Sequence, residues 1–300
     1  MNFVLIAVCL LAGITLRSAR VLPQDAHRGI NAWILYVALP AMSLLYIPAI
    51  EWSTALILPA AMPVGVWTVA WIALRFFGDR ITPDKQTQAA LLLTAGLGNT
   101  SFIGFPLTEA YLGHEGLRIA VICDQVNFIA LSAFGVMTAL KAAHSSTTGG
   151  KGVLKTLVRF PPFAAFAAAL ILPRFFSLEP VVPLLTRLGN TLVPLALFSV
   201  GLQIHFSEWK RELRCLTAGL TYKLLFAPTL VLGAALVFQV RGFPAKASIL
   251  EAAMAPMITS AILASEYKLN PRLANLMVSV GTLISLGTTA FWFLVCRALF

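Results

Sequence analysis

The sequence predicts an all-α polytopic membrane protein: ten transmembrane helices arranged as two inverted five-helix repeats, with broken, crossing helices four and nine. Three observations lead to this prediction. The 300 residues are 59% hydrophobic and only 11% charged, whereas a soluble domain is about a quarter charged. Apolar segments of about 20 residues, the length that crosses a bilayer, recur along the whole chain. Helix-breaking residues interrupt two of these segments near their middle.

Hydropathy, with Gly, Pro and charged residues as boundaries, divides the chain into spans and loops. The first apolar run lacks the basic start and the small-residue cleavage site of a signal peptide, so we interpret it as the first span. The longest polar stretch follows the fifth span and is interpreted as a cytoplasmic linker, residues 141–153, between a first repeat at 1–140 and a second, inverted repeat at 154–300. The ten predicted spans are residues 2–16, 29–50, 54–77, 88–113, 116–140, 154–174, 181–204, 212–239, 245–266 and 272–298.

Basic residues are distributed unequally between the predicted loops. With the N-terminus outside, fifteen of the 22 Lys and Arg residues fall in cytoplasmic loops and six in the outer loops or at the C-terminus. Cytoplasmic loops of membrane proteins carry such an excess, so both termini are expected outside. The net charge of +10 is explained by this bias. Nucleic acid is not an expected partner, because no basic cluster is interleaved with aromatic residues on a soluble surface.

Five spans in each half have a topological consequence. A second copy that follows an odd number of spans inserts upside down, which gives an inverted repeat. Weak internal similarity agrees with this: Asn99 and Pro256 are 157 residues apart, and so are Glu109 and Glu266. A proline inside the second span likewise has a counterpart in the seventh.

Breaks inside two apolar spans give the clearest functional signal. The fourth span contains Gly-Asn-Thr-Ser at residues 98–101 followed by Pro106, and the ninth contains Pro256. Because proline stops one helix and suits the first turn of the next, we expect Pro106 and Pro256 to begin the second half-helices. Half-helix N-termini at such a break suit a carboxylate, and the opposite carbonyl ends suit a cation. The alternative is a pair of simple proline kinks in packed helices.

Ionisable residues inside the spans are a further signal, because a charge at the bilayer centre costs at least about 2.5–3.5 kcal/mol. Lys223 could pair with Asp124 or Glu251, or meet an anionic substrate; the sequence leaves these alternatives open. The expected ion-coupling residues, which would supply part of a sodium site or a proton-carrying carboxyl, are Asp124, Gln125, Asn127 and Glu251. The expected substrate-binding residues are Asn99, Thr100, Ser101, Pro106, Lys223, Pro256, Thr259 and Ser260.

Enzymatic chemistry is not expected. The four histidines fall in loops without an HExxH pattern, the four cysteines lack CxxC spacing, and no phosphate-binding loop is present. We therefore expect no catalytic residue, no metal and no cofactor. A proton or sodium gradient would supply the driving ion, and protons are preferred because a single acidic residue with a lysine nearby suits a protonation switch better than a full cation cage.

Three motifs resemble the auxin efflux carrier family: LGNTSFIGFPLTEAYLGHEGLRIAV at 97–121, LVPLALFSVGLQI at 192–204, and the segment at 252–291 that contains MAPMITS and VGTLIS. The resemblance covers nearly the whole chain. It implies crossing broken helices, as in the bile-acid-transporter and sodium/proton-antiporter folds, and transport of organic anions such as indole acetate or malonate. Two details depart from the family pattern: Ala255 separates Met254 from Pro256, and Gly281-Thr282 replaces part of a Ser-Thr segment. The short linker resembles that of a bacterial inner-membrane member.

The main hypothesis is therefore a secondary active transporter of a small organic anion, a carboxylate of the auxin or malonate kind, that works by alternating access. The alternatives are a sodium-coupled symporter of the bile-acid-transporter type and a non-transporting membrane sensor. The expected partners are the small organic anion and the lipid bilayer, and a homodimer remains open.

Overall fold

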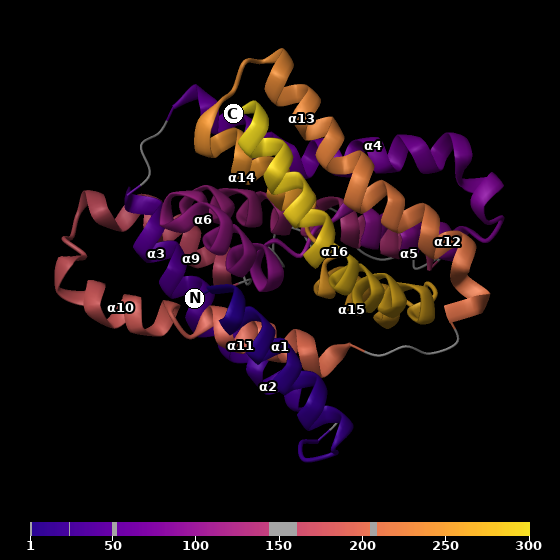
Figure 1. The fold of residues 1–300 in the computed structure, drawn as a ribbon, viewed down its shortest axis with the longest axis horizontal. Helices are drawn as coiled ribbons and strands as arrows, with labels where there is room; N and C mark the ends of the chain where they lie inside the picture. Colours follow the sequence, from indigo (N-terminus) through magenta and orange to yellow (C-terminus); the bar gives the residue numbers. More distant parts are fainter. Residues whose placement is uncertain (1, 24, 50–52, 144–160, 205–208) are drawn as a thin grey trace.

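The computed structural model describes residues 2–23, 25–49, 53–143, 161–204 and 209–300 (Figure 1). Within these ranges the regular structure is helical, and one isolated antiparallel bridge joins Gly98 to Pro256. Residues 144–153 of the predicted linker and the start of the predicted sixth span, residues 154–160, lie outside the described residues.

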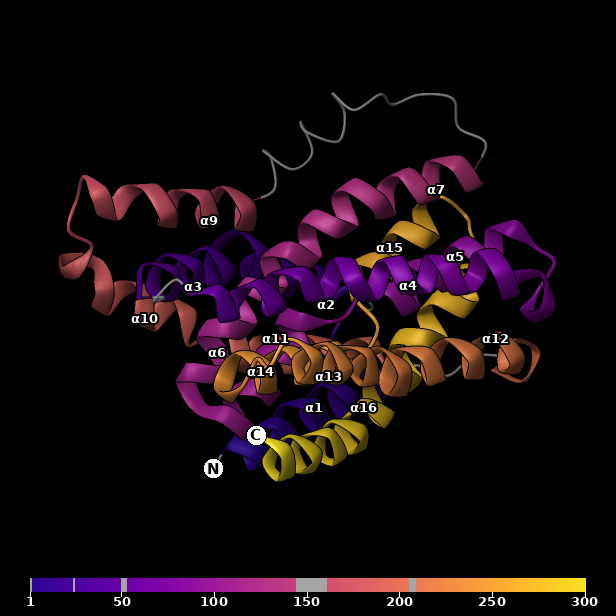
Figure 2. The same ribbon diagram turned by 90° about the horizontal axis from the view of Figure 1, so that it is seen from above.

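The described ranges contain fifteen α-helices, of which α7 is labelled in Figure 2 and the others in Figure 1, together with π-helical and 3-10 turns. The α-helices are α1 (Asn2–Ser18), α2 (Ala26–Trp33), α3 (Leu39–Tyr46), α4 (Ile57–Ile81), α5 (Lys85–Gly96), α6 (Phe105–Ala130), α7 (Val136–Ala142), α9 (Pro161–Ile171), α10 (Val182–Gly189), α11 (Leu192–Gln203), α12 (Trp209–Thr221), α13 (Ala227–Val237), α14 (Gly242–Ala252), α15 (Ile258–Glu266) and α16 (Pro271–Leu299). The π-helical turns are Ile34–Ala38, Thr100–Gly104, Leu131–Gly135 and Tyr222–Phe226. The 3-10 turns are Ile47–Ala49, Thr54–Leu56, Leu172–Arg174 and Glu179–Val181.

Six helical segments of the described chain are long and apolar enough to cross a membrane, and this supports the predicted integral membrane protein. They are Ala26–Tyr46, Thr54–Ile81, Thr100–Ala142, Glu179–Gln203, Lys210–Val237 and Pro271–Leu299, with a shorter apolar helix at Val4–Ser18. The 43-residue segment Thr100–Ala142 turns at Gly113, whose φ of +68° suits a residue without a Cβ. Two predicted spans are divided into shorter pieces, α5 with the start of α6, and α14 with α15. The division into ten spans stays a prediction.

The helices form two groups, which we call the first group (α1–α3 and α9–α11) and the second group (α4–α7 and α12–α16). In the first group α1 packs on α11, and α3 packs on α9 and α10. In the second group α6 packs on α4 and α14, while α16 packs on α5, α12 and α15. Figure 1 shows the first group toward the lower left and most of the second group toward the upper right, and Figure 2 shows α9 and α10 at the far end from α12 and α5.

Several long-range hydrogen bonds lie within one group, whereas the bond between Tyr46 Oη and His114 Nδ1 at 3.5 Å joins the two groups. Within the first group, the indole N–H of Trp33 donates to Thr191 Oγ1 at 2.9 Å, and the hydroxyl of Ser199 donates to Asn31 Oδ1 at 2.5 Å. Within the second group, the amide of Asn270 donates to Thr87 Oγ1 at 3.1 Å. These bonds within a group join segments more than 150 residues apart in sequence. Each group is therefore built from both halves of the chain.

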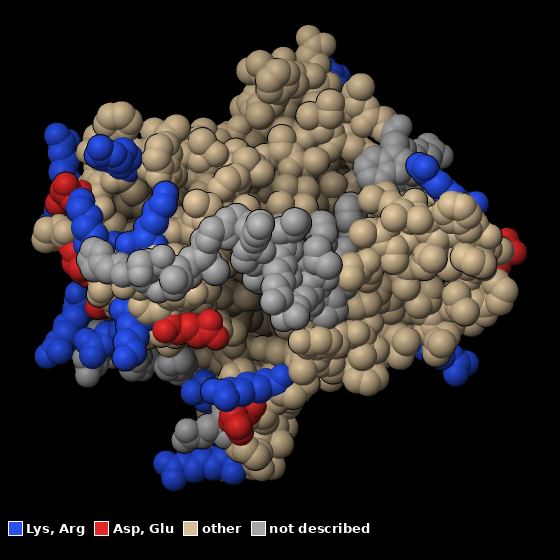
Figure 3. All heavy atoms as spheres, turned by 180° about the vertical axis from the view of Figure 1, so that it is seen from behind, with Lys and Arg blue, Asp and Glu red and all other residues tan. Residues whose placement is uncertain are grey.

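Charged side chains lie mainly at the margins of the molecule. In Figure 3, Lys, Arg, Asp and Glu gather at the left and lower edges of the visible face, a few lie at the right, and a broad surface without visible charge separates them. Large apolar side chains are exposed elsewhere too, for example Phe76 and Val237, each 75% exposed. An apolar belt between charged ends is the surface that a bilayer requires, because hydrocarbon stabilises no exposed charge.

The closest helix contact of the first group depends on two glycines. A Cβ added to Gly201 of α11 would collide with the backbone carbonyl of Leu10 and would lie 3.0 Å from the Cα of Gly13 in α1. Small residues allow this kind of close backbone approach between membrane helices.

We predict that Gly201→Ala lowers the free energy of unfolding by about 1–3 kcal/mol, because the atoms that the new methyl group meets are backbone atoms that cannot turn away. Gly233→Ala in α13 is the matched control, since nothing lies within 4 Å of its added Cβ. Unfolding of the purified variants by dodecyl sulfate in detergent micelles measures the difference. Equal stability of the two variants would contradict the close approach.

Candidate functional site

Two unwound segments, residues 97–99 and 253–257, meet inside the second group, and we call their meeting point the crossing. The first follows α5 and the second follows α14. Every residue of both segments is buried. They run antiparallel, and the backbone pairings are the Gly98–Pro256 bridge, Asn99 N–H to the Ala255 carbonyl at 2.7 Å, and Met257 N–H to the Leu97 carbonyl at 3.1 Å. The two breaks expected from the sequence therefore satisfy each other's backbone.

Pro106 lies at the start of α6, as the sequence pattern predicted, although a π-helical turn precedes it, whereas Pro256 does not begin a helix. In the fourth span the helix resumes at Thr100, because the Asn99 side chain accepts from Phe102 N–H at 3.2 Å, and Pro106 follows in the first turn of α6. In the ninth span α15 begins two residues after Pro256, which lies in the unwound segment itself. The bridge uses the N–H groups of residues 99 and 257, so Pro256 loses no hydrogen bond there.

Gly281 of α16 explains one departure from the family pattern. A Cβ at this position would lie 2.5 Å from Pro256 Cδ and 2.9 Å from Leu220 Cδ2. Pro256 Cδ belongs to a rigid ring, so it cannot move aside without shifting the unwound segment. Glycine at residue 281 therefore lets α16 pack directly on the crossing.

A network of polar side chains lies beside the first unwound segment. The hydroxyl of Thr100 donates to Asp124 Oδ1 at 2.6 Å, and the amide of Asn127 donates to the Gly98 carbonyl at 2.7 Å and to Thr100 Oγ1 at 3.3 Å. Thr100, Asp124 and Asn127 are each at most 2% exposed. The structure thus joins two of the expected ion-coupling residues to an expected substrate-binding residue.

Several polar atoms near the crossing have no partner. Five of the seven buried side-chain N and O atoms without a hydrogen bond, within the described part of the chain, belong to four of the predicted site residues: Asn99 Nδ2, Asp124 Oδ2, Gln125 Oε1 and Nε2, and Glu251 Oε2. An unpaired buried polar group costs about 1–3 kcal/mol, so native proteins retain few of them. The unpaired atoms of Asn99, Asp124 and Glu251 belong to residues at or beside the crossing, where a polar ligand would find partners.

A second charged cluster lies beside the other unwound segment. Lys223, only 1% exposed, donates from Nζ to the carbonyl of Ala252 at 2.8 Å. Glu251 accepts from Thr108 Oγ1 at 2.7 Å, and its carboxylate lies where a Cβ on Gly104 would be. Lys223 and Glu251 interact electrostatically without forming a direct ion pair. Lys223 therefore takes a backbone carbonyl as its direct partner, which was not among the alternatives the sequence left open.

The remaining predicted residues contribute less directly. Ser260 donates back to the Met257 carbonyl at 2.7 Å and so closes the first turn of α15, whereas Thr259 beside it is half-buried. Ser101 is buried and interacts with Asp124. Thr108 was missed by sequence reasoning. Its spacing of four from Gly104 places both on one helix face, and this was the signal that could have found it.

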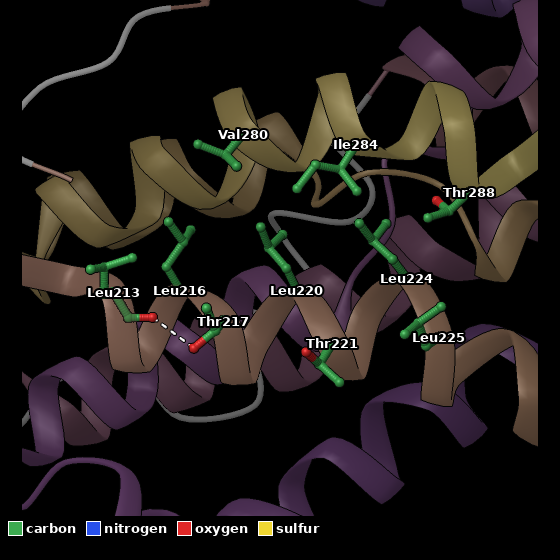
Figure 4. A pocket seen from close by; sticks show the side chains of 10 residues that line it. All are labelled: Leu213, Leu216, Thr217, Leu220, Thr221, Leu224, Leu225, Val280, Ile284 and Thr288. Carbon is green, nitrogen blue, oxygen red and sulfur yellow. Dashed lines mark hydrogen bonds between the residues drawn. The ribbon is translucent and has the colours of Figure 1, made fainter. Parts of the chain in front are cut away.

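Several grooves open on the surface of the described chain, and one of them is apolar throughout the side chains that line its centre. This groove of about 530 Å³ lies between α12 and α16, where Leu216, Leu220 and Leu224 face Val280 and Ile284 (Figure 4). None of its lining residues in the described chain is charged. Such a groove offers no compensation for an ionic solute, so it is not the candidate site.

A smaller and more polar pocket of about 230 Å³ lies between the two groups. The guanidinium of Arg17 there donates to the carbonyls of Leu202 at 2.6 Å and Ile204 at 3.2 Å. Ile258, the first residue of α15, also lines the pocket, which therefore reaches the end of the crossing. Its polar lining residues are Arg17, His27, Gln203, Asn275 and Ser279.

The fold and this site define a membrane transport protein, and comparison with known proteins agrees. The chain matches the family described as membrane transport protein over residues 2–293. It is 26% identical over 291 residues to an uncharacterized transporter of Methanothermobacter thermautotrophicus. The aligned residues are 96% of this chain and 95% of the relative. It is 24% identical over 302 residues to an uncharacterized transporter of Methanocaldococcus jannaschii, covering 97% of each. The chain belongs to this family, the auxin efflux carrier family that its motifs resemble.

We predict that Asn127→Leu lowers the free energy of unfolding by about 1–3 kcal/mol, because it leaves the buried Gly98 carbonyl without its side-chain donor. The neighbouring Gln125→Leu is the control: its amide atoms have no partner, so stability should stay the same or rise. Dodecyl sulfate unfolding of both variants measures this. If Gln125→Leu were the more damaging of the two, the network described above would be wrong.

Proposed function

We propose that this protein is a secondary active transporter that moves a small organic anion, a carboxylate of the auxin or malonate kind, by alternating access. The observation that carries the proposal is the crossing with its unpartnered donor, Asn99 Nδ2, at the start of a half-helix. A carboxylate there would accept from the amide and lie at the positive end of the helix dipole. The proposed substrate contacts are Asn99, Thr100, Ser101 and Pro106 from one break and Pro256, Thr259 and Ser260 from the other.

Contacts between helices support the inverted repeat that this mechanism requires. Helix α1, at the start of the first half, packs on α11 of the second half, and α9, at the start of the described second half, packs on α3 of the first half. Likewise α4 packs on α5 as α13 packs on α14. Such exchanged pairs are expected of two inverted copies that share one interface. We therefore propose that residues 1–140 and 154–300 are inverted repeats joined by a linker at 141–153.

Separation of the two helix groups supports a moving site. The hydrogen bonds at the crossing all join elements of the second group, so the crossing can move as one body against the first group. The polar pocket at Arg17 lies between the groups and ends at Ile258. An anion could approach the crossing through this pocket, attracted by the guanidinium.

Orientation and location are part of the proposal. We infer that both termini are outside, because the larger number of basic residues falls in the loops assigned to the cytoplasm. The short linker supports a bacterial inner (plasma) membrane. The alternatives are a sodium-coupled symporter of the bile-acid-transporter type and a membrane sensor without flux.

Uptake of radiolabelled malonate, succinate and indole acetate into proteoliposomes, with an imposed pH or sodium gradient, separates these functions. Accumulation driven by a pH difference is the expected result. Accumulation that requires sodium would favour the symporter, and absence of flux for every anion would favour the sensor.

We predict that Asn99→Ala reduces uptake in this assay by at least about 100-fold, because the substrate carboxylate loses a charge-assisted hydrogen bond in a buried site. Asn190→Ala, at an exposed position outside the site, is the control and should transport as the unaltered protein does. Insertion and monodispersity of both variants are checked by size-exclusion chromatography. Normal flux in Asn99→Ala would show that the break is only a kink.

A separate prediction concerns coupling, for which we propose Asp124 as the proton-carrying group, with Gln125, Asn127 and Glu251 around it. Asp124→Asn keeps the shape of the side chain and an acceptor oxygen for Thr100 but cannot release a proton. Substrate binding should persist while accumulation driven by the pH gradient is lost, so that uptake only equilibrates. The readout is the ratio of internal to external malonate with and without the gradient. Retained accumulation would make Asp124 a structural carboxyl.

A further inference from the structure

The end of α14 presents an unusual electrostatic problem. The last carbonyls of a helix have no partner within the helix, and together they carry a partial negative charge. Here that end, at Ala252, is fully buried at the crossing and lies next to the Glu251 carboxylate. In carriers with broken helices, the carbonyl ends of half-helices are where a coupling cation binds.

In this chain the position is occupied by a side chain. Lys223 Nζ donates to the Ala252 carbonyl at 2.8 Å and interacts with the charge of Glu251. Gly98 of the other unwound segment borders the ammonium group, since an added Cβ there would lie 3.0 Å from Nζ. The ammonium therefore lies between both segments of the crossing, and it is 1% exposed.

The backbone around Lys223 is built to hold it there. Lys223 lies in the π-helical turn Tyr222–Phe226, and such single turns inside α-helices are frequent at functional sites. Its two neighbours are anchored in other helices: the hydroxyl of Tyr222 donates to the Val66 carbonyl at 2.5 Å, and the indole of Trp292 donates to the Leu224 carbonyl at 2.9 Å. Lys223 is thus directed away from the apolar groove that Leu224 lines.

The other half of the chain has no such cation. At the spacing of 157 residues that relates the two breaks, the counterpart of Lys223 is Val66 and that of Ala252 is Ala95. Near the end of α5, a neutral amide, that of Asn127, supplies the donor to Gly98. The ammonium is therefore specific to one helix end and is not a general requirement of a broken helix.

We propose that Lys223 is a resident cation: its ammonium occupies the cation position at the carbonyl end of α14, so that the crossing neither needs nor admits sodium. This inference rests on the proposed carrier function and identifies which ions that carrier can use. It predicts that removing the side chain creates a site for a small free cation. A methionine of similar length should fill the same space without creating one.

The test measures thermal stability of the purified full chain in detergent, in sodium chloride against choline chloride, and so needs no substrate. The unaltered protein should show the same Tm in both salts. Lys223→Ala should have a lower Tm in choline and regain about 2–4 °C in sodium or ethylammonium chloride, as expected for a ligand that binds only the folded state. Lys223→Met should respond to neither salt, and Lys246→Ala on α14 is the control for loss of a positive charge elsewhere.

Two results would overturn the inference. One is stabilisation of the unaltered protein by sodium, or binding of ²²Na⁺ to it, because the position would then be open. The other is a folded Lys223→Ala protein that responds to neither sodium nor ethylammonium. If Lys223→Ala does not fold in any of these salts, ²²Na⁺ binding is measured on the unaltered protein and on Lys223→Met instead. Binding of ²²Na⁺ to one or both proteins contradicts the proposal. The proposal is supported if both proteins bind none. Lack of flux in proteoliposomes would leave these results unchanged, so the two proposals fail separately.

Discussion

Pairing between the two unwound segments is the constraint on which the rest of this structure depends. A break in one membrane helix leaves backbone groups that lipid cannot satisfy, and each such group costs several kcal/mol. The segments at 97–99 and 253–257 meet this cost together, because each offers the donors and acceptors that the other lacks. Neither break is stable without its counterpart. Two halves of the chain must therefore come together before the site exists, and small residues such as Gly281 are needed where other helices approach it.

The ionisable side chains at the crossing form hydrogen bonds with hydroxyl groups and a helix-end carbonyl rather than direct ion pairs with each other. Asp124 accepts from Thr100, Glu251 accepts from Thr108, and Lys223 donates to a carbonyl. A direct buried ion pair would neutralise its members and fix them against each other. The observed arrangement instead leaves one oxygen of each carboxyl without a partner. These oxygens can gain a proton or a ligand without breaking an existing bond, which is the property that a coupling group needs.

The sequence predicted the breaks and the buried charges well, because Gly, Pro and ionisable residues in apolar spans are conspicuous. The sequence could not predict the register of the crossing. That register depends on which backbone groups of the two segments pair in space, and the segments are far apart in the sequence. Pro256 was expected at the start of a half-helix and lies in the unwound segment, because the bridge tolerates a missing N–H there. The partner of Lys223, the Ala252 carbonyl, was missed because the sequence analysis considered only charged side chains as partners. The carbonyl end of a helix also attracts a cation, and a pattern of charged residues does not reveal it. Thr108 was missed because its one signal is the spacing of four from Gly104, which places both residues on one helix face.

Alternating access places different demands on contacts inside and between the moving parts. Contacts inside each part must persist. In the first group these include the close backbone contact of α1 with α11 at its glycines, and in the second group they include the backbone hydrogen bonds of the crossing. In the proposed mechanism, contacts between the parts would exchange; there α11 packs on the turn Thr100–Gly104, and a polar pocket lies beside Ile258. Because the Lys223–Ala252 bond lies wholly within the second group, the ammonium would travel with the crossing in the proposed mechanism. A cation tethered to the protein returns to its starting position in each complete cycle and would add no net charge movement, so the net electrical work of transport would come from the substrate and the coupling ion.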